Sequence, residues 1–170
     1  MGISGFEPVF LVGIEAVREE HGARLAALGG RRLTGCSLVR FVEDGGWFAD
    51  CPVVVDFDGV RVEICHRKFD ELSIGWNTID TTAQVTGWQW VESTPAWSGT
   101  DARLEPFVGQ ILRDASLLEW RPSGRDLAYA TIAVEFAFDT GRFRVANGLD
   151  ENSIEVGKAH TDYVRHRLAR

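Results

Sequence analysis

One cysteine and one histidine in this sequence could do chemistry together. An Asp-Gly pair at positions 58 and 59 predicts a two-residue hairpin turn, and counting back from it sets Cys51 opposite His66. With Cys36 as a further ligand, the two could begin a zinc site, or they could form a nucleophilic pair. Zinc needs three or four ligands. We therefore predict a small buried cysteine beside a hydrogen-bonded histidine, with no metal and no cofactor.

Two acidic pairs are the next candidates, because each is followed by the same residues. Asp70-Glu71 and Asp150-Glu151 both lead, after one residue, into Ser-Ile. Two carboxylates 5–10 Å apart could perform acid–base chemistry on a glycoside. An aspartate that caps the turn after a hairpin explains the recurrence more simply. The catalytic alternative is a small, hydrolase-like enzyme that uses His66 with Asp70 and Glu71.

Tryptophan is unevenly distributed along the chain. Trp76, Trp88, Trp90 and Trp97 lie within 22 residues, and Trp88 and Trp90 would share one face of a strand at 85–91. Exposed tryptophans bind sugars, bases and peptides, whereas buried ones fill a core. These four residues are the predicted ligand-binding residues, and core filling is the alternative.

Motifs and charge narrow the function. The sequence lacks a G-x-S-x-G elbow, a Walker A or G-x-G-x-x-G loop, and the H-E-x-x-H and C-x-x-C motifs. The net charge of −7 disfavours nucleic acid and suits either solubility or a basic protein partner. We therefore predict a non-catalytic protein that binds a protein partner, such as a basic one, or a small ligand.

The compartment and the C-terminal segment follow from the same composition. Three cysteines do not make a disulfide framework, and no apolar stretch is long enough to span a membrane, so we expect a cytoplasmic protein. Residues 158–170 hold four cations and one aspartate, a charge of +3. This segment could contact phosphate, but a solvated short helix over 159–168 is the simpler expectation.

The sequence also indicates an internal duplication. Residues 23–41 and 102–120 match at seven of nineteen positions, against about one expected by chance. We predict one domain over 1–170, with repeats at approximately 23–80 and 102–160 and a joint at 92–101. Each repeat would form a β unit, and the two would pack about a pseudo-two-fold axis.

Apolar periodicity gives the expected elements. The hairpin at 52–66 alternates cleanly between an apolar and a polar face, and a second hairpin would turn at Thr140-Gly141. Helical spacing favours a helix within residues 10–28. Further strands are predicted near 33–41, 72–79, 85–91, 111–120 and 153–156. The predicted fold is mainly β, a sandwich or a partly closed barrel with one or two short helices.

Overall fold

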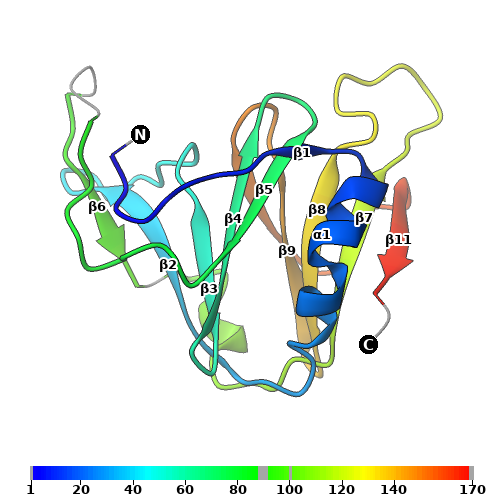
Figure 1. The fold of residues 1–170 in the computed structure, drawn as a ribbon, viewed down its shortest axis with the longest axis horizontal. Helices are drawn as coiled ribbons and strands as arrows, with labels where there is room; N and C mark the ends of the chain where they lie inside the picture. Colours follow the sequence, from blue (N-terminus) through cyan, green and yellow to red (C-terminus); the bar gives the residue numbers. More distant parts are fainter. Residues whose placement is uncertain (1, 88–91, 100, 169–170) are drawn as a thin grey trace.

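The structure, a computed structural model, describes residues 2–87, 92–99 and 101–168. These residues form a mainly β fold with one α-helix (Figure 1). The elements are β1 (Leu11–Val12), α1 (Ile14–Ala26), β2 (Leu33–Phe41), β3 (Val53–Phe57), β4 (Val60–Arg67), β5 (Glu71–Trp76), β6 (Pro95–Ser98), a short 3-10 helix (Glu105–Phe107), β7 (Asp114–Trp120), β8 (Ile132–Phe138), β9 (Gly141–Asn147), β10 (Asn152–Val156) and β11 (Tyr163–Arg167).

Two antiparallel sheets face each other across the main core (Figure 1). The strand order is β1-β5-β4-β3-β2-β6 in one sheet and β10-β9-β8-β7-β11 in the other. Their inner faces meet in one apolar cluster, in which the ring centroids of Phe57 and Phe136 are 5.1 Å apart. The predicted mainly β fold is confirmed, and the sheets do not close into a barrel.

The outer faces of the two sheets differ. A second apolar cluster, the outer cluster, covers the six-stranded sheet and consists of Ile3, Val39, Phe48, Cys51, Val54, Ile79 and Val85. The N-terminal segment, the β2–β3 loop and the residues after β5 pack there against Val39 of β2 and Val54 of β3. On the five-stranded sheet the corresponding cluster is small and holds Leu118, Ala133 and Ala146.

The first hairpin has the predicted register. Phe57 pairs with Val60 and Val55 with Val62, and Asp58 and Gly59 both have positive φ at the tip. Every second residue of β3 and β4 enters the main core, as the alternating pattern requires. Val54, predicted on the polar face, is buried as well because the outer cluster covers it.

The second hairpin differs from the predicted one by one residue. Phe136 pairs with Phe143 and Phe138 with Gly141, so the turn is Asp139-Thr140 and not Thr140-Gly141. Both registers direct the same side chains into the core, and the apolar pattern therefore could not distinguish them. Arg113 holds the turn from outside through a 2.7 Å hydrogen bond to Asp139.

The helix α1 is present and the predicted C-terminal helix is not. Gly22 does not interrupt α1, which continues to Ala26, and the glycine is buried in the helix. The segment predicted as a helix over 159–168 contains β11, which pairs with β7 at the edge of the sheet. Its Tyr163, Arg165 and Arg167 lie on one face of the strand, and the predicted helix did not take this alternation into account.

Other predicted strands shift or fall outside the description. The strand predicted at 72–79 is β5, which ends at Trp76, and the strand predicted at 111–120 begins at Asp114. The strand predicted at 85–91 lies largely in the undescribed residues 88–91. The predicted joint at 92–101 contributes β6 to the first sheet.

Two short segments from the two halves pair with each other at the lower end of Figure 1. Four backbone hydrogen bonds of 2.8–2.9 Å join them, from Gly30 N to Leu112 O, from Gly109 N to Leu33 O, from Leu33 N to Gln110 O and from Leu112 N to Arg31 O. The strands that follow, β2 to β5 and β7 to β10, each pair in sequence order. We call these four hydrogen bonds the crossing. No helix in the described residues is both long and apolar enough to cross a membrane.

Candidate functional site

His66 is a structural residue that joins the two sheets. It is only 2% exposed, and its Nε2 lies 2.8 Å from the carbonyl oxygen of Ile132 in β8. Its Nδ1 lies 3.0 Å from Asn152 Oδ1, which also accepts the His66 backbone N–H at 2.9 Å. Burial lowers the pKa of His66, although both hydrogen bonds oppose this shift. Both ring nitrogens are thus occupied by protein atoms.

Cys51 does not face His66 as the sequence predicted. β3 begins only at Val53, after Pro52, so the hairpin ladder does not reach Cys51. Its side chain packs in the outer cluster, and its carbonyl oxygen accepts a 2.8 Å hydrogen bond from Asn152 Nδ2. The predicted pairing of thiol and imidazole is therefore wrong.

The three thiols are reduced and buried. Burial raises the pKa of Cys36 to about 11 and that of Cys65 to about 12, and it raises the pKa of Cys51 further. A thiolate is the form that attacks carbon or binds zinc, so these sites disfavour both roles. In the described part of the chain, no three side chains of His, Cys, Asp or Glu are grouped to hold a metal ion.

The acidic pairs lie in the two hairpin loops that meet between the sheets. Hydrogen bonds from Lys68 and Arg67 lower the pKa of Glu71, with N–O distances of 3.0 and 2.7 Å. Asp150 accepts the backbone N–H of Lys68 from the other half. Asp70 and Glu151 form no ion pair within the described residues. These contacts are those expected of carboxylates that hold turns.

The predicted ligand-binding tryptophans do not lie on a single surface. Trp76 is 9% exposed in β5, whereas Trp97 is half-buried in β6 against the outer cluster. The strands β4, β3 and β2 separate β5 from β6 in the sheet. Trp88 and Trp90 lie outside the described residues. Trp76 lines a pocket.

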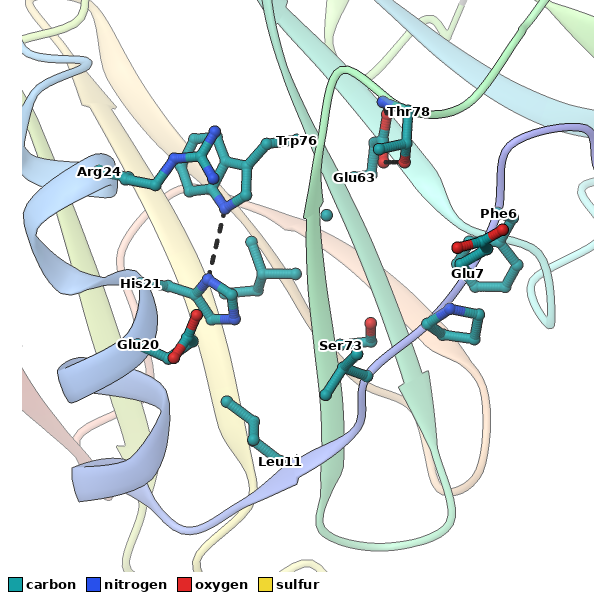
Figure 2. A pocket seen from close by; sticks show the side chains of 14 residues that line it. Phe6, Glu7, Leu11, Glu20, His21, Arg24, Glu63, Ser73, Trp76 and Thr78 are labelled. Atoms are coloured by element: carbon teal, nitrogen blue, oxygen red, sulfur yellow. Dashed lines mark hydrogen bonds between the residues drawn. The ribbon is translucent and has the colours of Figure 1, made fainter.

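That pocket has a volume of about 360 Å³ and opens between α1, β5 and the N-terminal segment (Figure 2). β1 pairs only with Glu71 and Leu72, so no described strand covers the β5 edge from residue 73 to 76. We call this cavity the α1–β5 pocket. Its polar and aromatic lining comprises Phe6, Glu7, Glu20, His21, Arg24, Glu63, Ser73, Trp76 and Thr78.

His21 presents a hydrogen-bond donor to the α1–β5 pocket. The indole Nε1–H of Trp76 donates to His21 Nδ1 at 3.3 Å, and an indole nitrogen cannot accept. Nδ1 is therefore unprotonated, and the proton of the neutral ring is on Nε2. Burial lowers the pKa of His21, while Glu20 raises it and Arg24 lowers it, so the neutral ring is favoured. Within the described residues Nε2 has no hydrogen-bond partner, and Figure 2 shows the ring inside the pocket.

Arg24 lies over Trp76, with its guanidinium carbon 4.3 Å from the ring centroid (Figure 2). It has no ion pair with any described residue. Such cation–π stacking fixes the guanidinium at the pocket mouth while most of its N–H groups stay available.

Glu63 is a buried carboxylate at the opposite wall. It accepts hydrogen bonds of 2.6–2.8 Å from Thr78 Oγ1 and from the backbone N–H groups of Thr78 and Ile79. No described Lys or Arg forms an ion pair with it. Gly75 leaves room for it, because a Cβ at that position would lie 2.5 Å from Glu63 Oε2. With Glu7 and Glu20, the pocket lining holds three carboxylates and one guanidinium. The pocket therefore electrostatically favours a cationic group.

Sequence reasoning missed most of this pocket. The sequence places His21 only within the predicted helix at 10–28, and it predicts no site role for Glu20, Arg24 or Glu63. The available signal was one histidine among apolar residues at helical spacing. No protein-family model, no curated protein and no solved structure matches this chain.

Proposed function

We propose that this protein is a non-catalytic binding protein whose ligand site is the α1–β5 pocket. The observation that carries the proposal is the unused hydrogen-bonding capacity of the pocket: His21 Nε2–H has no hydrogen-bond partner among the described residues, and the exposed Arg24 guanidinium, stacked on Trp76, has no ion pair among them. A few polar groups that converge on a partly aromatic cavity are typical of a ligand site.

The favoured ligand, on a protein partner or as a small molecule, combines a basic group with a hydrogen-bond acceptor. Glu7, Glu20 and Glu63 attract a cation, while His21 Nε2–H can donate to a neighbouring carbonyl oxygen. A net charge of −7 would steer a basic partner toward the surface and accelerate association. Aromatic residues such as Trp76 commonly supply much of the binding energy.

The enzymatic alternative has less support. His66 is enclosed between the sheets with both ring nitrogens engaged, and Glu71 is held in ion pairs with Arg67 and Lys68. A general base must reach the proton that it abstracts. Neither His66 nor the Asp70-Glu71 pair lines the α1–β5 pocket.

A pull-down from native lysate, read by mass spectrometry, tests the binding function. Glu20→Arg places a cation at the pocket, and Glu19→Arg makes the same change on the neighbouring exposed position, which does not line it. We expect a protein to be retained by the wild type and by Glu19→Arg and lost with Glu20→Arg. Equal retention by all three, or equal loss with both variants, would count against the pocket.

We also propose that the two halves arose by duplication. A shift of 79 residues converts the Gly30–Leu112 hydrogen bond of the crossing into the Gly109–Leu33 bond, and both glycines have a φ of 89°. Asn77 and Gly157 are likewise equivalent, since each has positive φ and donates to an arginine carbonyl at the start of a hairpin strand.

The three reduced thiols support a cytoplasmic location.

A further inference from the structure

The outer face of the five-stranded sheet is the open counterpart of a covered surface. Val54 in β3 pairs with Ser37 in β2, and Glu135 in β8 pairs with Ser116 in β7. The two positions are therefore equivalent in the two sheets. Val54 belongs to the apolar outer cluster, whereas Glu135 is covered by the side chains of Arg142, Arg144 and Arg165, and the apolar cluster on its face is small. A charged residue therefore stands in the second sheet where the first sheet has an apolar one.

The register places charged side chains in rows across this open face. One row runs Arg144, Glu135, Ser116 and Arg167 over neighbouring strands, and the next row runs Arg142, Ala137 and Asp114. Because alternate residues of a strand share a face, all of these side chains project to the same side. The small residues between them leave space above the sheet.

Glu135 anchors the arginines without neutralising them. It is 1% exposed, and Arg142, Arg144 and Arg165 all form ion pairs with it, the first two at 3.2 and 3.6 Å. Arg144 is further paired with Glu155 at 2.6 Å. One carboxylate cannot occupy the N–H groups of three guanidiniums, each of which has five. Arg142 and Arg165 therefore remain able to donate to a ligand.

Arg167 is the fourth arginine of the face, and it has no ion pair or side-chain hydrogen bond within the described residues. Together with Arg142 and Arg165 it surrounds a depression of about 360 Å³ whose other lining residues are Asp114 and Ala137. The strands of this face hold four cations, Arg142, Arg144, Arg165 and Arg167, and three anions, Asp114, Glu135 and Glu155, which gives a charge of +1. This charge stands out on a chain whose net charge is −7.

We propose that this depression binds a phosphate group as a dianion. Three guanidiniums that converge on one space suit the tetrahedral oxygens of phosphate, to which each can donate two parallel hydrogen bonds. Three arginines against one aspartate give the lining of the depression a charge of +2, which suits a phosphate monoester at neutral pH and above. The group could be borne by a small phosphate ester or by a phosphorylated side chain. Nucleic acid is disfavoured by the acidity of the rest of the molecule.

NMR titration of the full chain at pH 7.5 and constant ionic strength tests this site. The probes are inorganic phosphate, capped phosphoserine and, as a monoanionic control, acetate. We expect saturable shifts in β9 and β11 with the phosphates only. Arg167→Gln removes a guanidinium that the fold does not use, and should weaken phosphate binding about ten-fold. Arg18→Gln, on the exposed side of α1, should leave binding unchanged.

The outcomes separate the alternatives. Tighter binding of phosphoserine than of inorganic phosphate would support a phosphorylated side chain, and the opposite order would support a small phosphate. No saturable shift, equal shifts with acetate, or equal affinity of wild type and Arg167→Gln would overturn the proposal. So would an oligonucleotide that binds this face and is not displaced by inorganic phosphate.

Discussion

Two buried histidines use their ring nitrogens in different ways. Both ring nitrogens of His66 contact protein oxygens, and the residue so connects the two sheets. In His21, one nitrogen accepts a hydrogen bond from Trp76 and the other carries an N–H that points to the α1–β5 pocket. Burial lowers the pKa of each. The difference in their partners, and not in their burial, is what makes His21 the candidate for ligand binding.

Protonation of His21 should break its contact with Trp76, because two N–H groups would then face each other. Since its folded pKa lies below the unfolded value of about 6.5, its contribution to stability is fully present above that pH. The contribution is lost as the pH falls through the folded pKa. We expect the His21 ring and the Trp76 indole N–H resonances to shift together, with a midpoint below 6.5. A Trp76 midpoint at or above 6.5 would contradict the assignment.

For individual residues, the sequence shows which side chains could be reactive, but it does not show which of them lie in contact in the fold. The Cys51–His66 pairing followed from counting along a ladder that in fact starts two residues later, after Pro52. His21 and Trp76 are 55 positions apart and come together only because α1 packs beside β5. The apolar periodicity of a helix or strand predicts which face is buried, but not which other element packs against it. The pocket between α1 and β5 therefore could not be predicted from the sequence.

The elements were predictable where one face had to be apolar. The hairpin of β3 and β4 combines an Asp-Gly turn with strict alternation, and a slip of one residue would expose its apolar face. The β8–β9 hairpin allows two registers with the same buried set, and β11 carries too few apolar residues to reveal its period. The prediction was wrong at these two elements because the apolar pattern did not distinguish the registers of the first and was too weak in the second.

Val62 tests the packing of the first hairpin. It is fully buried and pairs with Trp76 across β4 and β5. We expect Val62→Ala to lower the free energy of unfolding by about 2 kcal/mol or more through lost burial and a cavity. Urea denaturation measures this loss. Val42, 66% exposed, is the matched control, and a similar loss for Val42→Ala would contradict the interpretation.

At the scale of the molecule, the recurrence of residues 23–41 in 102–120 predicts two similar units, and each half contains four strands, β2 to β5 and β7 to β10, that pair in sequence order. The outer faces could not be foreseen in this way. Whether a strand face is covered depends on where the N-terminal segment and the residues after β5 lie, and these have no counterpart in the other half.

Gly30 and Gly109 test the equivalence of the halves. Both have a φ of 89° and open space where a Cβ would lie, so an alanine suffers backbone strain alone. We expect Gly30→Ala and Gly109→Ala each to cost about 1–2 kcal/mol of stability. Gly35→Ala, also in open space but without positive φ, should cost little. A large loss at only one of the two glycines would argue against equivalent roles.

The crossing also bears on how the chain folds. Gly30 and Gly109 are 79 positions apart (109 − 30), so none of its hydrogen bonds can form until a long loop has closed. Loop closure of this kind costs entropy that grows slowly with length, but it delays the contacts that reward it. Each set of four strands, β2 to β5 or β7 to β10, can assemble from neighbouring strands. Its apolar face stays exposed to water until the other set packs against it. The two halves therefore depend on each other kinetically, and the interval before they meet is when the chain is most prone to aggregate.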